Sequence, residues 1–206
     1  PEETISIHRK EPVYDGKYSN ECYINRIESA LNMFSKVSQL NIETIDSWIF
    51  HLPYAYQGRR SAVNMWVKYF AEDNRDIQDK LGYIWKEKPE KRDSEDYNNW
   101  TKSISKSSPY IEFVQKHIAP SEKMSSEIGN MYTASIFMAM LSAIAFSQNN
   151  LQNLMFLAYG SGSKSKVFHG KITKRMSSEL IKNRLLEGIK DRQRISVEEY
   201  EKQHSL

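Results

Sequence analysis

The sequence predicts an α/β protein, and three observations support that prediction. The run "DSWIFHLP" (residues 46–53) is typical of a short buried strand, ended by a proline that cannot donate to a sheet. Two β-rich runs at residues 153–163 and 165–172 are separated by a Gly/Ser turn, which predicts a hairpin. Segments with helical periodicity lie around these strands, as in a mixed α/β fold.

The helices are expected where apolar residues recur with helical spacing. In the first of them, Tyr23, Ile27 and Leu31 share one face, and Ser19 is a candidate N-cap. A late helix is expected to start at a Ser178 cap. The helical segments expected are residues 21–37, 58–74 and 131–146, the late helix that begins at about residue 178, and residues 196–203. A polar excursion of helical pieces, expected to be mostly solvated, occupies about residues 73–127.

Composition limits the class of protein. The chain has 206 residues, 39% hydrophobic and 27% charged, as expected of a globular protein with a sizeable core. Its net charge of +3 is far below that of a dedicated nucleic-acid binder, so nucleic acid is not an expected partner. The most apolar segment, residues 134–146, is too short to span a bilayer, so no membrane partner is expected.

Cysteine content and the start of the chain bear on the compartment. The single cysteine, Cys22, excludes an internal disulfide and a cysteine metal cluster, and we expect it to be an inert buried thiol. A reducing compartment, the cytoplasm by default, fits this usage, and residues 1–10 show no secretory pattern. The chain begins with Pro1 rather than methionine, so we expect a piece of a longer protein.

His51 lies in the apolar run, close to the predicted end of the strand. Ligands gather outside strand ends in α/β folds, and an imidazole there can hydrogen-bond a carbonyl oxygen and stabilise charge on it. A lone histidine in an apolar run is more often a satisfied core residue. Both interpretations stay open on this pattern alone.

Two further segments have the same double interpretation. In "GNMYTAS" (residues 129–135), Asn130 and Thr133 fit as helix caps, yet a helix N-terminus with an amide side chain also suits a carbonyl or anionic ligand. In "YGSGS" (residues 159–163), the glycines fit a tight turn or a close backbone approach to a ligand, with Ser161 as a donor. Basic residues follow the strand and surround the hairpin, and are either solvated or phosphate contacts: Arg59, Arg60, Lys164, Lys166, Lys171, Lys174 and Arg175.

The motifs that are missing narrow the chemistry. The sequence contains no HExxH, no paired CxxC, no GxSxG and no GxGxxG. No carboxylate spacing singles out an acid/base pair. We therefore expect neither a metal site nor a nucleotide cofactor.

Five segments, taken in order, resemble the C-terminal half of hydroxymethylglutaryl-CoA synthases. They are "DGKYSNECYI", "WIFHLPY", "EIGNMYTASIF", "LMFLAYGSGSKSKVFHGKI" and "IKNRLLEGIKDRQRISVEEYE". The resemblance spans nearly the whole chain and is weakest between Asp73 and Glu127. It implies that residues 1–206 form one C-terminal thiolase-like domain, normally one half of an αβαβα sandwich.

The resemblance also implies an activity and its substrates. The family condenses acetyl-CoA with acetoacetyl-CoA, and needs no cofactor beyond these thioesters. Its nucleophilic cysteine and its general acid/base glutamate belong to the N-terminal half, which this chain does not contain, so the chain alone is expected to be inactive. The N-terminal half, either a separate chain or a missing part, is thus an expected partner, and the full protein is expected to form a homodimer.

Site residues carry over position by position. His51 matches the family's active-site histidine, which binds and polarises the acetoacetyl group. Asn130 and Ser161 match residues that line the acyl pocket, where Tyr132 and Pro53 are also expected. The family often has a lysine near the CoA phosphates, five residues after the histidine. Tyr56 stands at that position here, and Arg59 and Arg60 are the candidate replacements.

Two other functions stay open. One is a β-branching synthase of polyketide pathways, which takes acetoacetyl on an acyl carrier protein, and the departure at Tyr56 is compatible with it. The other is a non-catalytic acyl-CoA-binding scaffold, against which the presence of His51, Asn130 and Ser161 argues.

Overall fold

A three-stranded mixed sheet forms the centre of the molecule. The computed structural model of the chain describes residues 15–91, 94–148, 150–160, 162–173 and 177–204. Strand β1 (Ser47–Phe50) pairs in parallel with β2 (Asn153–Gly160), which pairs antiparallel with β3 (Lys164–Lys171). The predicted buried strand, the hairpin and the α/β class are therefore confirmed.

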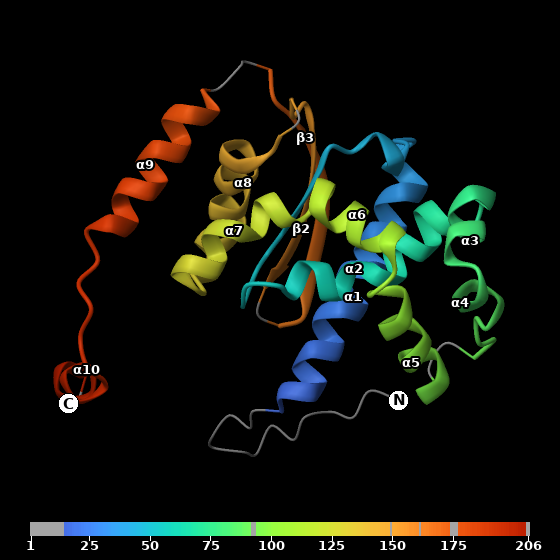
Figure 1. Ribbon diagram of the computed structural model, residues 1–206, viewed down its shortest axis with the longest axis horizontal. Helices are drawn as coiled ribbons and strands as arrows, with labels where there is room; N and C mark the ends of the chain where they lie inside the picture. Colours follow the sequence, from blue (N-terminus) through green and yellow to red (C-terminus); the bar gives the residue numbers. More distant parts are fainter. Residues whose placement is uncertain (1–14, 92–93, 149, 161, 174–176, 205–206) are drawn as a thin grey trace.

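Helices lie on both sides of this sheet (Figure 1). Helices α7 (Ala119–Ile128) and α8 (Ser135–Phe146) lie on one side, and α2 (Gln57–Trp66) and α6 (Ser108–His117) lie on the other. On the α2 and α6 side, the Trp48 ring packs against Phe113 and Phe70, with ring centroids 5.4 and 6.1 Å apart. Trp48, Ile49 and Phe50 are all fully buried. The strand that precedes His51 is thus held from both faces.

Helix α1 (Gly16–Ser38) begins earlier than predicted. Asp15 is its N-cap and accepts hydrogen bonds from the backbone N–H groups of Lys17 and Tyr18, both at 3.0 Å. The prediction of a Ser19 cap is wrong, because a carboxylate at Asp15 already serves the first turn. The apolar face is confirmed by the burial of Tyr23, Ile27 and Leu31. A 3₁₀ turn (Ile42–Thr44) then leads into β1.

The helix predicted after β1 is confirmed as α2 (Gln57–Trp66), continued by a π-helical turn (Val67–Ala71). The polar stretch that follows contains α3 (Arg75–Leu81), α4 (Tyr83–Lys86) and α5 (Glu95–Ile104). This stretch is less solvated than expected. Tyr97 and Trp100 are buried, and the Trp100 indole donates to the carbonyl oxygen of Ile84 at 2.6 Å.

Helices α6 (Ser108–His117) and α7 (Ala119–Ile128) cross the outer side of β1. The Ser121 hydroxyl lies 3.3 Å from the Trp48 carbonyl oxygen, and the Ser47 hydroxyl donates to the carbonyl oxygen of His117 at 3.2 Å. The junction of the two helices therefore covers an edge strand that would otherwise be open.

The apolar helix is confirmed as α8 (Ser135–Phe146), which starts later than predicted because a 3₁₀ turn (Tyr132–Ala134) precedes it. Ala139 and Ala143 on its inner face are fully buried. In the described part of the chain, no helix combines the length and apolar content needed to cross a bilayer.

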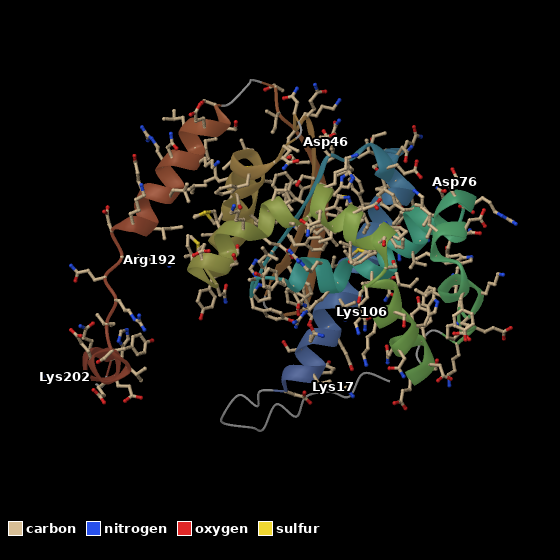
Figure 2. All side chains as sticks on the ribbon, viewed as in Figure 1. Lys17, Asp46, Asp76, Lys106, Arg192 and Lys202 are labelled. Carbon is tan, nitrogen blue, oxygen red and sulfur yellow. The ribbon has the colours of Figure 1, made fainter. Side chains whose placement is uncertain are left out.

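The C-terminal arm consists of α9 (Ser178–Lys190) and α10 (Val197–His204). Ser177 caps α9 instead of Ser178, since its hydroxyl oxygen accepts the Leu180 N–H at 3.2 Å. Arg192, labelled in Figure 2 where α9 ends, donates to the carbonyl oxygen of Glu127 at 2.5 Å and so ties the arm to the end of α7. Figure 1 shows α10 apart from the rest of the chain.

Candidate active site

His51 directly follows β1 and is bound through its backbone on both sides. Its N–H donates to the carbonyl oxygen of Leu157 in β2 at 3.0 Å, which extends the parallel pairing by one residue. Its carbonyl oxygen accepts a 2.6 Å hydrogen bond from the hydroxyl of Tyr23. The side chain is half-buried, so the residue is positioned at the strand end without being sealed in the core.

Burial lowers the pKa of the His51 imidazole from its ordinary value of 6.5. The charged form is disfavoured because desolvation costs an imidazolium more than a neutral ring. At neutral pH the ring is therefore uncharged, with one nitrogen as a donor and the other as an acceptor.

The turn of the hairpin lies at the same end of the sheet as His51. Parallel pairing brings the carboxyl ends of β1 and β2 together. Tyr23 contacts both, since its ring also packs on Tyr159 with centroids 4.9 Å apart. Beyond Tyr159, Ser161 lies outside the described residues. The flanking Gly162 and Ser163 have φ values of 75° and 52°, the left-handed backbone that a glycine adopts without strain.

Asn130 and Tyr132 lie before α8, whose first turn is at the same end of the molecule as the carboxyl ends of β1 and β2 (Figure 1). The Asn130 Oδ1 accepts from the Tyr132 N–H at 2.8 Å and from the Ser135 hydroxyl at 3.3 Å. These contacts stabilise the turn that precedes α8. The prediction that Asn130 or Thr133 caps a helix is wrong, because Met131 and Ala134 occupy the N-cap positions and Thr133 lies inside the 3₁₀ turn. Its Nδ2 donors have no partner among the described residues, and Tyr132 is 79% exposed.

The two arginines after the strand, Arg59 and Arg60, differ in whether their charge is paired. Arg59 is paired with the carboxylate of Glu122, with Nη2–Oε2 and Nε–Oε2 distances of 2.5 and 2.6 Å. Its guanidinium also lies 4.6 Å from the centre of the Tyr56 ring. Arg60 is exposed, and its nearest aromatic contact is Tyr54 at 5.8 Å. Arg60 is thus the one of the pair whose charge is available to a ligand.

Glu122 was missed by the sequence reasoning. It is 1% exposed and accepts both the side chain and the backbone N–H of Arg59. Its neighbours along the chain gave no signal, because "SEKMSSE" contains two glutamates with similar surroundings. Only the packing of α7 against the start of α2 distinguishes the buried Glu122 from the exposed Glu127.

Pro53 and Tyr56 belong to the loop between β1 and α2. Pro53 is half-buried two residues after His51, and Tyr56 is exposed just before the first residue of α2. Cys22, expected to be buried, is half-buried instead, on the first turns of α1. Within the part of the chain that the structure describes, no three His, Cys, Asp or Glu side chains converge on a point that suits a metal ion.

A groove of about 1120 Å³ opens beside this loop, between α1, α2, α5 and α6. Four basic residues line it, Lys36, Arg59, Arg60 and Lys102, together with the acidic Glu21 and Glu28. Neither His51 nor Asn130 lines it. Arg60 is therefore the predicted site residue that belongs to the groove and is exposed, while His51 lies at the strand end.

Solved structures with the same arrangement of helices and strands define the class of this domain. The HMG synthase of the curacin biosynthetic pathway matches 96% of this chain and 43% of its own length, with a TM-score of 0.67 and 19% identity. It has also been solved in complex with an acetyl donor-ACP. MvaS in complex with 3-hydroxy-3-methylglutaryl coenzyme A matches 97% of the chain, with a TM-score of 0.63 and 21% identity. The domain has the thiolase-like fold of these synthases.

Sequence comparison identifies the family. The profile described as hydroxymethylglutaryl-coenzyme A synthase C terminal matches residues 6–206, so the chain belongs to that family. A hydroxymethylglutaryl-CoA synthase of Haloferax volcanii is 24% identical over 208 residues, which cover 95% of this chain and 46% of the relative. The chain thus spans less than half the length of that relative. The predicted resemblance is confirmed, whereas the roles of the individual site residues stay predictions.

Proposed function

We propose that the chain supplies the histidine side of the active site of a hydroxymethylglutaryl-CoA synthase-like acyltransferase. The complete enzyme condenses acetyl-CoA with acetoacetyl-CoA, and its nucleophilic cysteine and catalytic glutamate come from the N-terminal half. The observation that supports this most directly is a half-buried His51 at the end of β1, in a chain of the synthase family.

The chemistry requires a donor at the ketone oxygen of the acetoacetyl group. When the acetyl carbanion attacks the ketone carbon, a carbon–carbon bond forms and the C=O electron pair moves onto oxygen. A neutral His51 donates an N–H hydrogen bond to that oxygen, and a fixed donor of this kind contributes about 3 kcal/mol to transition-state stabilisation. The backbone bonds of His51 to Leu157 and Tyr23 keep the ring in place beforehand.

The remaining acyl-pocket residues orient the two thioesters. Asn130 offers Nδ2 donors that the described residues leave unused, and Ser161, Tyr132 and Pro53 complete the wall of the pocket in this proposal. Holding both acyl groups at attack distance removes much of the entropic barrier of a two-substrate reaction.

The CoA phosphates are assigned to Arg60 rather than to Arg59. Arg60 is exposed and lines the groove beside the His51 loop, whereas Arg59 is committed to Glu122. Tyr56 stands where relatives often carry a lysine, and its ring covers the Arg59 guanidinium. No cofactor beyond the thioester substrates is needed for this reaction. We assign the full enzyme to the cytoplasm and expect it to form a homodimer.

A second candidate is a β-branching synthase that takes acetoacetyl on an acyl carrier protein. The exposed Tyr56 at the lysine position weakens one expected CoA contact, and a similar synthase has been solved with a donor-ACP. The basic Lys36, Arg60 and Lys102 of the groove offer charges to an acidic carrier. A non-catalytic scaffold is the third candidate.

The test combines the chain with its own N-terminal half and follows the loss of acetoacetyl thioester. We expect activity only in the combination, and a fall in kcat of about 100-fold or more for His51→Ala. His117→Gln is the matched control, because His117 lies at the other end of the sheet, beside Asp46. We expect this substitution to leave kcat unchanged. A His51→Ala enzyme with full activity contradicts the proposed role.

The same assay separates the three candidates. A preference for acetoacetyl-CoA supports the first, and a preference for acetoacetyl-carrier protein supports the second. Tight acyl-CoA binding without turnover in the combined protein supports the scaffold.

A further inference from the structure

We propose that Glu122 is a positioning residue for His51, acting through the first turn of α2. The inference rests on the proposed role of His51 in catalysis, but its structural basis is separate. Glu122 belongs to α7, far along the chain from both His51 and α2. Its carboxylate nevertheless holds Arg59, in the first turn of the helix that follows the His51 loop.

The first contact of Glu122 is that of a helix cap supplied from another helix. The Oε1 atom accepts the backbone N–H of Arg59 at 3.1 Å, in the first turn of α2. Tyr56, at the N-cap position itself, makes no capping hydrogen bond with its side chain. A helix start needs acceptors for its free N–H groups and favours negative charge there, and Glu122 supplies both.

The second contact is with the Arg59 side chain. The Oε2 atom accepts from Nε at 2.6 Å and lies 2.5 Å from Nη2, while the Glu122 side chain is 1% exposed. The Tyr110 hydroxyl donates to the Arg59 carbonyl oxygen, so Arg59 is held at both its backbone and its guanidinium. Burial raises the pKa of the Glu122 carboxyl and Arg59 opposes that rise, as expected of a buried charge that depends on its partner.

The first turn of α2 packs closely against Phe50, the residue before His51. A methyl group placed on Gly58 would lie 2.8 Å from the Phe50 ring and 3.3 Å from the Glu122 Oε1. Phe50 is fully buried in the core. Any shift of α2 towards the sheet therefore reaches Phe50, and through it the His51 backbone.

Glu122 can serve as a fixed point because α7 is itself anchored. The Ser142 hydroxyl of α8 donates to the Pro120 carbonyl oxygen at 2.6 Å and accepts the Met124 N–H at 3.1 Å. These two bonds flank Glu122 on either side. The same helix ends just before Gly129 and Asn130, so Glu122 links the loop that carries His51 to the segment that carries Asn130.

The test reads the imidazole directly, by NMR titration of the His51 and His117 ring protons in the intact chain. Both imidazoles have a pKa lowered by burial, but His117 lies at the other end of β1, where it packs against Phe113 and Asp46. For Glu122→Ala we expect the His51 pKa to rise towards its ordinary value, since the loop admits water, with the His117 pKa unchanged. Glu122→Gln keeps an acceptor for the Arg59 N–H and is expected to give a smaller shift.

Glu127→Ala, five residues later on the exposed side of α7, is the matched control and should move neither histidine. Arg59→Gln gives an independent reading if Glu122→Ala does not fold, and the same shift of His51 alone is expected. Equal shifts of both histidines, or none at either, in the variants that fold would overturn the proposal. The readout is a titration and not turnover. An unmoved His51 pKa would therefore overturn this proposal even if the His51→Ala enzyme is inactive, as the proposed function expects.

Discussion

The hydroxyl of Tyr23 donates a 2.6 Å hydrogen bond to the carbonyl oxygen of His51, so helix α1 holds the backbone of the candidate catalytic residue. Tyr23 is 2% exposed, and burial raises the pKa of its hydroxyl well above the ordinary value, which keeps it protonated as a donor. The contact joins two segments 28 residues apart in the sequence. It explains how the backbone of a residue whose side chain is only half-buried is nevertheless fixed.

Tyr23→Phe should therefore destabilise the chain. The ring and its packing on Tyr159 remain, but the His51 carbonyl loses its donor, at a cost of about 1–2 kcal/mol in the free energy of unfolding. Urea denaturation measures this. Tyr83→Phe, at a tyrosine that is 71% exposed, is the control and should change stability by less than about 0.5 kcal/mol. Equal effects from both variants would show that the buried hydrogen bond has no special weight.

Two helical glycines should respond in opposite directions to alanine. Gly58→Ala places a methyl group 2.8 Å from the buried Phe50 ring, so overpacking of about 1–3 kcal/mol outweighs the better helix propensity of alanine. Gly188→Ala in α9 meets nothing within 4 Å and should stabilise the helix by up to about 1 kcal/mol. Thermal unfolding of both variants checks the pair. A stabilised Gly58→Ala would mean that the start of α2 is free to move.

Local patterns in the sequence predicted the strands, several of the helices and the position of His51 at the end of β1. The apolar run before Pro53 identified β1 and left His51 at its carboxyl end, and the Gly/Ser turn identified the hairpin. These two conclusions need only residue spacing and turn chemistry. The parallel pairing of β1 with β2, which brings the two segments together, was not predicted, because a long helical connection permits it without requiring it.

What the sequence could not predict depends on which way a side chain faces in the folded molecule. Arg59 and Arg60 are neighbours, but successive helical residues point about 100° apart, so one meets Glu122 and the other faces solvent. Asp15 and Ser19 are both good caps, and only the path of the chain chooses Asp15. The burial of Glu122 arises from contact between helices far apart in the sequence.

Acid should destabilise the chain through its buried histidines. The pKa values of His51 and His117 are lowered from 6.5 by burial, so the unfolded state takes up protons more readily than the folded state. Stability is then fully present above about pH 6.5 and falls as the pH drops below it, towards the folded pKa values. Urea titrations between about pH 7.5 and 5.5 measure the slope. His51→Gln combined with His117→Gln should remove most of it, and a slope of the opposite sign would contradict the burial argument.

Glu122 should contribute with the opposite sign at lower pH. Burial raises its pKa above the ordinary 4.5, so the folded state takes up this proton first and gains stability as the pH falls through the raised value. Glu122→Gln removes that term, so its stability relative to the parent chain should be greatest at neutral pH and should decrease on acidification. A difference that does not change with pH would show that the carboxyl group titrates alike in both states.

Arg60 should govern the affinity for coenzyme A. Arg60→Met removes an exposed charge at the groove, and we expect CoA to bind about tenfold more weakly, which corresponds to about 1.4 kcal/mol. The salt dependence of binding should weaken as well, because one ionic contact is lost. Arg184→Met, which removes the same charge from the exposed face of α9, is the matched control. Calorimetric titration of both variants with CoA measures the difference. Unchanged affinity in Arg60→Met would move the phosphate site away from α2.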